Sequence, residues 1–583
     1  MSAGVCAIKE QYLIKNEYSN QSQEDTSEPC NDNADNTSKS DVDGETPNKK
    51  IKLSNSQKKR NRGQNKARPA PFKVSNNDKL CRELIDVLEN EIRTCTYKGC
   101  KSQHNVLEYL KNKPKDIGDT CYVYKVRGRC PFGLSCRFGS QHISENGYNL
   151  ISDDYDSNKP KSTLSQINSS LQYKLRKKEY DFKLTEQSVK KIEDMMESNE
   201  ELKKNITETN RIGCVTDEDI VPTKKREKKK IDWKNKLFLS PLTTVGNLPF
   251  RRICKEFGAD VTCGEMALSI PILQGATQEW ALVKRHVSED LFGVQLCGFK
   301  AHLVGSAVQL LQENCSIDFI DINLGCPIEL IYQSGAGSAL LRRPKVLESI
   351  VRTCVDIMDI PLTIKTRTGV YADKNVAHDF IPQFKEWGVS CATIHGRSRE
   401  QRYTKTADWE YIEKCAASVE NEMPVIGNGD ILSYEDYLEA KRIAPHISGV
   451  MLGRGALIKP WIFSEIKEQK AKDISSSERF EIIKRYINYG LEHWGSDTKG
   501  VENTRRFFLE WQSFLYRYVP LGLLERPPQK VNERPPAYQG RDYLETLMAS
   551  NNCKDWIKIS EMLLGPVPDG FSFLPKHKAN SYA

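Results

Sequence analysis

Residues 319–327 read Phe319-Ile320-Asp321-Ile322-Asn323-Leu324-Gly325-Cys326-Pro327, an apolar strand that ends abruptly at a glycine, a cysteine and a proline. In a parallel β/α protein, a thiol just beyond the end of a strand lies where substrates bind. A glycine there lets the backbone approach a ligand, and a proline sets the exit of the turn. Cys326 by itself is equally compatible with a structural role, because free cysteine is among the most buried residue types. The neighbouring sequence has to distinguish the two interpretations.

The sequence around this strand alternates between short apolar runs and amphipathic helical periodicity. Eight βα units in about 235 residues predict a TIM (β/α)8 barrel of the α/β class, and we place it at residues 233–470. The eight runs with strand character are 237–240, 261–265, 291–296, 319–323, 362–367, 391–395, 425–428 and 449–453.

Polar side chains occur at or just beyond the ends of nearly all these strands, which is where a barrel carries its active site. They are Glu265, Gln295, Asn323, Lys365, Arg367, His395, Asn428 and Arg454. Unpaired polar groups are costly in a core, so this repeated placement favours a binding site over core packing. The loops 427–430 and 453–455 are glycine-rich and follow strands seven and eight, where many barrels bind phosphate. We therefore expect a phosphorylated cofactor or substrate.

Two groups of cysteine and histidine precede the barrel, within residues 76–145. The second group is spaced x8, x5 and x5, and the first has spacings x4 and x3 with a more distant cysteine as candidate fourth ligand. The ligands are Cys121, Cys130, Cys136 and His142 in the second group, and Cys81, Cys95, Cys100 and His104 in the first. Three thiolates and one imidazole satisfy tetrahedral Zn²⁺, and this segment is too short and polar to bury these residues in a core of its own. We predict two structural zinc fingers.

Aromatic and cationic residues lie between the ligands of the second finger. They are Tyr122, Tyr124, Lys125, Arg127, Arg129, Phe132, Arg137 and Phe138. Such interleaving suits stacking on single-stranded bases and pairing with phosphates. The finger pair thus predicts RNA binding.

Chain length, net charge and cysteine content restrict the class of protein. A chain of 583 residues is too long for one core, and its net charge of +8 is unevenly distributed. It has no apolar run long enough to span a membrane and no secretory signal at its start. The 18 cysteines are then expected in a reducing compartment, cytoplasmic or nuclear, where metal binding or catalysis is more common than disulfides.

The remaining segments are expected to flank the two functional modules. Residues 1–75 are acidic and then basic, which predicts a disordered tail whose runs 49–52 and 58–62 are either a nuclear localisation signal, an RNA-contacting arm or a solvated face. Residues 146–232 predict a charged linker with helical tendency and a basic run at 224–230. Residues 471–583 predict a C-terminal helical domain, in which Trp511, Phe514, Leu515 and Tyr518 form a stripe best explained as core.

Several segments of the barrel together resemble the tRNA-dihydrouridine synthases. The matching segments are 241–251, 323–327, 365–369, 395–403, 427–430 and 453–455. Paired CCCH fingers before the barrel further resemble the eukaryotic subfamily that acts on uridine 47 of the variable loop. The opening Pro-Leu-Thr-Thr, residues 241–244, departs from the Pro-Met-Ala-Gly common in the wider family.

The resemblance implies FMN as cofactor, NADPH as reductant and tRNA as partner, with mRNA an open second substrate and a monomer as the expected state. Cys326 would protonate C5 of a flipped-out uracil while C6 receives a hydride. Asn323, Arg367 and Arg397 would contact the substrate, and Arg505, Arg506 and Arg517 are candidates to face tRNA. The implied FMN-binding residues are Pro241, Leu242, Thr243, Gln295, Lys365, His395, Asn428, Gly429, Asp430, Gly453 and Arg454. No Gly-x-Gly-x-x-Gly motif opens a βαβ unit, so NADPH is expected to visit the flavin transiently, with ping-pong kinetics.

Two other functions remain open at this point. One is an FMN-dependent reductase of a free pyrimidine or another small enone, which would need neither fingers nor basic runs. The other is a non-catalytic zinc-finger RNA-binding protein whose barrel is inactive, against which an intact Cys326, Lys365 and His395 argue.

Overall fold

The computed structural model describes residues 4–14, 68, 79–156, 162–206, 228–401, 405–576 and 582. Most of the predicted N-terminal tail, including both of its basic runs, lies outside the described residues, as do residues 224–227 of the third basic run and residues 402 and 403 of the matched segment 395–403.

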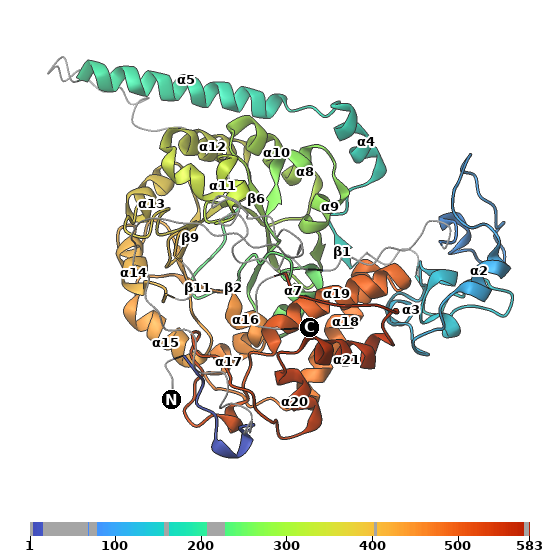
Figure 1. Ribbon diagram of the computed structural model, residues 1–583. Helices are drawn as coiled ribbons and strands as arrows, with labels where there is room; N and C mark the ends of the chain where they lie inside the picture. The colour runs from blue at the N-terminus through green and yellow to red at the C-terminus, as the bar shows by residue number, and fades with distance from the viewer. Residues whose placement is uncertain are drawn as a thin grey trace, which may run out of the picture.

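A closed barrel of eight parallel strands forms the centre of the molecule (Figure 1). Its strands pair in the order β2-β3-β6-β7-β8-β9-β10-β11, and β11 pairs back onto β2. The bounds are β2 Leu237–Leu239, β3 Val261–Cys263, β6 Leu291–Cys297, β7 Phe319–Asn323, β8 Leu362–Arg367, β9 Cys391–His395, β10 Val425–Asn428 and β11 Gly449–Leu452. Each predicted strand is present, so the predicted TIM barrel is confirmed. A short extra strand, β4 Ala267–Leu268, pairs with β6.

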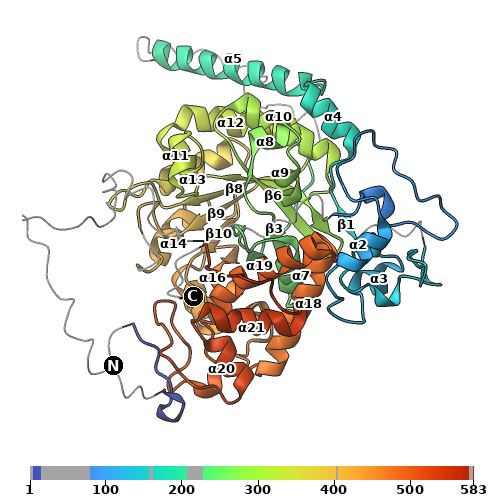
Figure 2. The ribbon, with the colours of Figure 1, turned by 45° about the vertical axis from the view of Figure 1, so that its right-hand side comes forward.

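Helices between the strands and after the last strand cover the outside of the barrel (Figures 1 and 2). They are α7 Leu248–Glu256, α8 Ser269–Leu273, α9 Thr277–Trp280, α10 Ala301–Asn314, α11 Glu329–Gln333, α12 Pro344–Ile357, α13 Ala377–Glu386, α14 Trp409–Ala417, α15 Tyr434–Ile443, α16 Arg454–Ile458 and α17 Ile462–Glu468. Local sequence explains where α7 begins, because Asn247 accepts a hydrogen bond from the amide of Phe250 and Pro249 lies in the first turn. No described helix is long and apolar enough to cross a membrane.

The C-terminal helices pack on the barrel and share its core. They are α18 Ser476–Trp494, α19 Thr498–Leu515, α20 Tyr543–Ala549 and α21 Cys553–Leu564. Trp511 is completely buried and donates a hydrogen bond from Nε1 to the carbonyl of Leu457 at 3.0 Å. The predicted core role of its stripe is therefore confirmed. Arg505 differs from the expectation that it faces tRNA: it is buried, pairs with Glu502 and donates to the carbonyls that end α21.

Residues 4–14 differ from the tail predicted for residues 1–75. Cys6 and Ile8 are buried against Leu523, Leu524 and Tyr538 of the C-terminal domain. Backbone bridges join this segment to residues 524, 534 and 538. A short apolar segment that is separated by a long polar stretch from its partner gives no periodic signal, so only the fold reveals this contact.

The linker carries two helices, α4 Ser169–Lys177 and α5 Lys183–Ile206, and its first part is anchored on the barrel. Figures 1 and 2 show α5 lying alongside α10 and α12. Thr185 donates a hydrogen bond to Gln309 at 2.8 Å, and Ser188 donates one to Asp356 at 2.9 Å. Near the end of the linker, Lys229 pairs with Asp318 at 2.7 Å. We expected a solvent-facing helix, but the first half of α5 is a packed outer layer.

Candidate functional site

The loop after β7 holds Cys326 at the carboxyl end of the barrel. Asn323 accepts hydrogen bonds at Oδ1 from the amides of Gly325 at 3.1 Å and Cys326 at 2.8 Å, which folds the chain into a tight turn. Ser338 donates a hydrogen bond to the carbonyl of Cys326 at 2.9 Å. These bonds fix the backbone of the cysteine from both sides.

The Cys326 thiol stays protonated at neutral pH. Burial raises its pKa, and this outweighs the opposing effects of the Ile328 amide and of Arg367 and Arg399. A protonated thiol is a proton donor and a poor nucleophile. The site thus suits general-acid chemistry better than covalent catalysis.

A chain of hydrogen bonds joins side chains of the neighbouring strands β6 and β7 inside the barrel. Gln295 donates from Nε2 to Asp321 at 2.7 Å, and Asn323 donates from Nδ2 to Oε1 of Gln295 at 2.8 Å. Thr363 donates to the other oxygen of Asp321 at 2.7 Å. Asp321 was not among the predicted site residues, although it alternates with Asn323 on the same strand. It fixes the orientation of the Gln295 amide.

Two cations lie at the end of β8. Lys365 donates from Nζ to Oδ1 of Asn428 at 3.1 Å, and burial together with Arg367 lowers the pKa of Lys365 to about 8. Arg367 donates to the carbonyl of Gly325 at 2.8 Å and to that of Ser398 at 3.1 Å. Arg367 therefore stabilises the cysteine loop through the Gly325 carbonyl, which is a structural role in addition to any substrate contact.

His395, at the end of β9, is a neutral imidazole in this site. Burial, followed by the nearby cations Arg367, Lys365, Arg397 and Arg454, holds the pKa of His395 well below its usual value. Four cations converge here from the ends of β8, β9 and β11, where an anionic ligand would be electrostatically favoured.

The predicted phosphate loops contain an ion-paired centre. Asp430 accepts hydrogen bonds from Arg397 at 2.5 and 2.7 Å and from Arg454 at 2.7 Å. Asp430 was expected among the residues that hold the phosphate, and its carboxylate is placed to orient the two arginines. Arg397 was expected at the substrate, yet its side chain is completely buried and also donates to the carbonyl of Lys405 at 2.7 Å.

Glycine is required at position 429. Gly429 has φ +144°, and an added Cβ would lie 2.5 Å from Cβ of Ala407. Across the site, a Cβ on Gly453 would lie 3.8 Å from Leu242 and Ser240, so the loop after β2 reaches the loop after β11. Pro241 and Leu242 are half-buried there and Thr243 is exposed.

The two predicted metal clusters both assemble. The ligand atoms of each set of four, Cys81/Cys95/Cys100/His104 and Cys121/Cys130/Cys136/His142, lie within 4.8 Å of one another. Cys81 completes the first set, with its sulfur 3.4 Å from that of Cys95. Cys81 is distant from the other ligands in sequence, and backbone hydrogen bonds of residues 79 and 81 with Gln103 hold it beside them. Three sulfurs and one imidazole nitrogen in such proximity fit tetrahedral Zn²⁺.

An outer layer orients the histidine of the second cluster. Asn149 contacts Nδ1 of His142 at 3.0 Å through its Oδ1, and its Nδ2 donates to Asp86 at 2.7 Å. Nδ1 is thereby occupied, which leaves Nε2 for the metal. The ring of Tyr124 stacks on that of His142 with centroids 5.3 Å apart. Asn149 lies beyond the predicted fingers and carried no motif signal.

Comparison with known proteins agrees with this architecture. Residues 238–514 match the family model described as dihydrouridine synthase (Dus), and residues 113–145 match that described as the DUS3L CCCH zinc finger domain. A Xenopus tropicalis protein named tRNA-dihydrouridine(47) synthase NAD(P)(+)-like is 48% identical over 624 aligned positions, which cover 100% of this chain and 97% of the relative. The human and Arabidopsis thaliana proteins of the same name are 50% and 42% identical, over 90% and 86% of this chain and 84% and 85% of theirs.

This chain belongs to the dihydrouridine synthase family. Membership confirms the predicted resemblance and the oxidoreductase class. The finger match covers the second cluster, and the first cluster is established by the geometry of its four residues alone.

In this dihydrouridine synthase the second finger is docked on α18 and α19 (Figure 2). The amide of Arg137 donates to the carbonyl of Ser496 at 2.8 Å. The backbone of Cys136 forms an isolated antiparallel β-bridge with that of Asp497. Arg127 pairs with Glu492 at 3.2 Å. Glu492 also pairs with Arg252 of α7 at 2.7 Å, so one carboxylate joins finger, barrel and C-terminal domain.

The packing of the second finger against the enzyme changes the role that we assign to the aromatic and cationic residues between its metal ligands. Phe138 is buried, Tyr124 stacks on a metal ligand, Tyr122 lies against Tyr489, and Arg129 pairs with Asp86 at 3.0 Å. We expected these side chains to contact RNA, but they hold the finger together and to the enzyme. Lys125 keeps an exposed side chain.

The rim beside Cys326 contains residues that the sequence did not single out. The guanidinium of Arg399 lies 3.8 Å from the ring centroid of Tyr332, and Arg342 donates to the Tyr332 hydroxyl at 3.1 Å. Arg399 lies inside a matched segment, which was the available signal, whereas Tyr332 and Arg342 carried none. Arg399 also pairs with Glu329 at 2.7 Å, and an aromatic ring flanked by arginines is a chemistry suited to a nucleotide.

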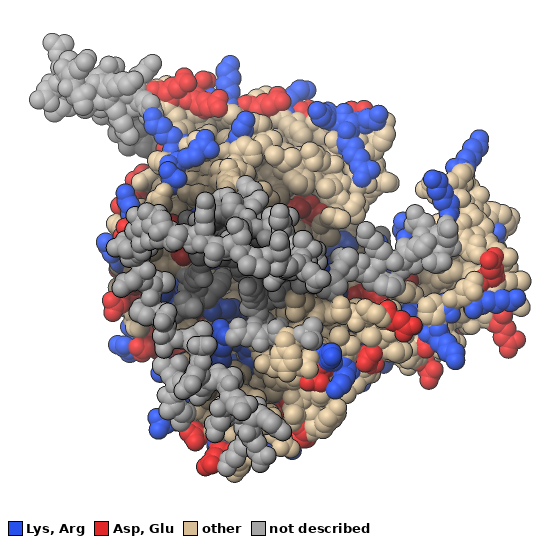
Figure 3. Space-filling model, in the orientation of Figure 1, with Lys and Arg blue, Asp and Glu red and all other residues tan. Residues whose placement is uncertain are grey.

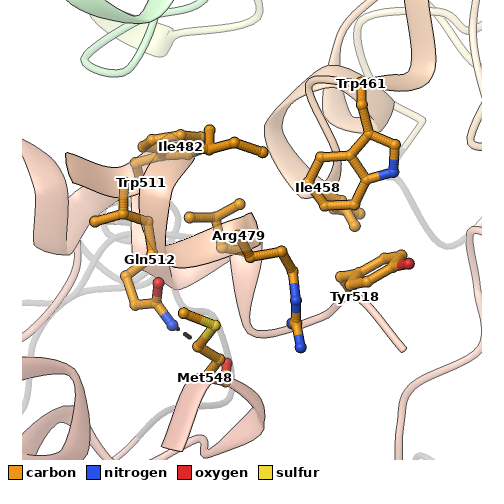
Figure 4. A pocket seen from close by; sticks show the side chains of 10 residues that line it. Ile458, Trp461, Arg479, Ile482, Trp511, Gln512, Tyr518 and Met548 are labelled. Carbon is orange, nitrogen blue, oxygen red and sulfur yellow. Dashed lines mark hydrogen bonds between the residues drawn. The ribbon is translucent and has the colours of Figure 1, made fainter. Parts of the chain in front are cut away.

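The described residues also form a basic surface patch and a small apolar cavity. Figure 3 shows Lys and Arg side chains gathered over α4, where Lys174, Arg176, Lys177 and Lys178 are exposed. Figure 4 shows a small apolar cavity lined by Trp461, Trp511, Tyr518 and neighbouring side chains. That cavity lies among the C-terminal helices and has no reactive group beyond the paired Arg479, so it is a packing defect rather than the active site.

Proposed function

We propose that this enzyme is an FMN-dependent, NADPH-consuming reductase that converts uridine 47 of tRNA to 5,6-dihydrouridine. The observation that carries the proposal is the buried, protonated Cys326 thiol on the same barrel face as the cations of β8, β9 and β11. A proton donor and an anion site on one face are the two elements that a flavin-dependent reduction of a C=C bond needs.

The donor set fits FMN. A ribityl phosphate needs cations and amides, which Arg454 and the backbone at Gly453 and Gly429 would supply. Gln295, Lys365 and His395 lie on the strands β6, β8 and β9, and the flavin ring would be bound among them. Lys365 would contribute positive charge near the N1/C2 edge of the ring.

The residues of the chain would divide the chemistry as follows. When bound, FMN would supply the hydride for C6 of uracil, drawn from NADPH. Cys326 would give its Sγ proton to C5, and solvent would reprotonate the thiolate. Asn323 and Arg367 would keep the cysteine loop in place through their bonds to Cys326 and Gly325.

The names of the relatives and two parts of the surface support an RNA substrate over a small one. The relatives are named for position 47 of tRNA, and the alignment with the Xenopus tropicalis relative covers 97% of that protein. The exposed cations of α4 and the stacked rim of Tyr332 would attract phosphates and bases. A uracil within a stacked helix cannot reach the site, so the nucleotide would have to flip out.

The test is to map dihydrouridine by mass spectrometry in RNA from cells lacking this protein and in cells complemented with wild type or Cys326→Ala. Loss at position 47 that only wild type restores is the expected result. Unchanged tRNA, together with reduction of free uracil by the purified enzyme, would favour the small-molecule alternative. Purified protein that binds RNA but holds no releasable FMN would favour the non-catalytic alternative.

A further inference from the structure

The loop after β2 contains a residue in an unusual conformation. Thr244 has φ +75°, a region that β-branched residues rarely adopt because the side chain crowds the backbone. It directly follows Pro241–Thr243, the residues proposed to lie against the flavin. Such strain persists only when the surroundings hold the residue in place.

All three polar groups of Thr244 are held. Its amide donates to Glu265 at 2.6 Å, its carbonyl accepts from Nδ2 of Asn247 at 3.2 Å, and its hydroxyl accepts from Nζ of Lys576 at 3.1 Å. Glu265 and Asn247 are near neighbours in the barrel. Lys576 comes from the far end of the chain, 332 residues away.

The C-terminal segment is itself fixed beside the barrel. The amide of Lys576 donates to Oε2 of Glu510 at 2.9 Å, and Glu510 is a buried residue of α19. Arg68 pairs with the same carboxylate and donates to the carbonyl of Leu574 at 3.2 Å. The backbone at Lys576 is thus held by Glu510 and not by the loop, and it places the Lys576 ammonium beside Thr244.

The position of the ammonium also has an electrostatic consequence. Glu265 is a carboxylate at the end of β3 whose burial raises its pKa, with Arg251 and Lys576 opposing that effect. Lys576 therefore supplies positive charge beside the acid at the end of β3. Hydrogen bonds from charged donors are stronger than neutral ones.

We propose that Lys576 is a positioning residue for the cofactor: its ammonium holds Thr244 in the left-handed conformation, and so sets the loop 241–243 against which the flavin binds. This inference rests on the proposed function for the identity of the cofactor. It assigns to the C-terminal end of the chain a part in building the active site of the barrel.

The test is a double-mutant cycle on flavin affinity, measured by titrating FMN into the apoprotein. Lys576→Met should weaken FMN binding about tenfold, because a charge-assisted hydrogen bond is lost. Lys576→Arg should keep most of the affinity. In a Thr244→Gly background the same Lys576→Met change should cost less than about threefold, because glycine adopts positive φ without help.

Two further variants separate positioning from simple destabilisation. Thr244→Val keeps the shape of the side chain but removes the acceptor, and it should reproduce the affinity loss even if Lys576→Met folds poorly. Lys558→Met, on the exposed face of α21, is the matched control and should bind FMN as wild type does.

The outcomes are distinguishable. Equal FMN affinity in wild type, Lys576→Met and Thr244→Val would overturn the inference and leave the proposed function intact. An equal loss from Lys576→Met in the Thr and Gly backgrounds would overturn it as well. Wild-type apoprotein that binds no FMN would instead refute the proposed function on which the inference rests.

Discussion

The side chain of Asn323 and the amide of Cys326 are joined by a 2.8 Å hydrogen bond, so the strand end that faces the barrel interior also sets the position of the thiol. Asn323 in turn donates to Gln295, which donates to Asp321. The position of the cysteine loop relative to the barrel is therefore fixed by a chain of three side chains, Asn323, Gln295 and Asp321.

Replacing Cys326 with alanine should preserve the flavin spectrum and NADPH oxidation but lower dihydrouridine formation about 10²–10⁴-fold, the usual contribution of a general acid. Because burial raises the pKa of the thiol above its ordinary 9.0, product formation by enzyme kept saturated with FMN should not fall between pH 7 and pH 9 through loss of the thiol proton. Single-turnover reduction of tRNA, quantified by mass spectrometry, checks both. Cys354→Ala, a buried cysteine of α12, is the control for loss of a thiol. Equal product from Cys326→Ala and wild type would refute the acid role.

Flavin affinity should depend on the charge of Lys365. Its pKa is lowered to about 8 by burial and Arg367, so the ammonium is present below that pH and is lost as the pH rises through it. FMN binding to the apoprotein should therefore weaken about tenfold between about pH 7 and pH 9, as a charge-assisted bond is lost. Fluorescence titration measures this. Lys365→Arg, which stays charged, should show a flatter profile, and an identical slope in both proteins would contradict the assignment.

Asn149 should control metal affinity from outside the ligand set. Asn149→Ala removes the partner of His142 Nδ1 and should weaken Zn²⁺ binding about 10–100-fold, as loss of such an orienting group usually does. Competition with a chromophoric chelator gives the affinity. Asn146→Ala is the matched control, because that side chain is exposed in the same loop. The idea fails if both variants release zinc at the same chelator concentration.

The ion pair of Arg251 and Glu289 should matter to stability far more than its surface neighbour. Both side chains are buried and joined at 2.7 Å, and Thr262 donates to the same carboxylate. Arg251→Met leaves Glu289 unpaired and should lower the free energy of unfolding by about 3–5 kcal/mol. Lys255→Met breaks the exposed pair with Asp290 and should cost about 0–1 kcal/mol. Denaturant melts would test this, and similar midpoints for the two variants would be the contrary result.

Long-range pairing accounts for what the sequence did not predict at the candidate site. Arg397 follows a strand at the barrel mouth, and the family resemblance implied a substrate contact for it. The fold turns it onto Asp430, 33 residues away, where its charge is satisfied inside the protein. The aromatic residues of the second finger were similarly ambiguous, because stacking on a base and packing on α18 need the same residue types.

The sequence by itself determined the barrel, the eight strands, the polar strand ends, Cys326 and the metal ligands other than Cys81. These follow from local periodicity and spacing, which are written along the chain and do not depend on distant partners. Only the tertiary structure decided that Cys81 completes the first cluster, that residues 4–14 cover the C-terminal helices and that Lys576 reaches Thr244. Those contacts join segments separated by tens to hundreds of residues, and each exists only because the folded chain brings the two segments together.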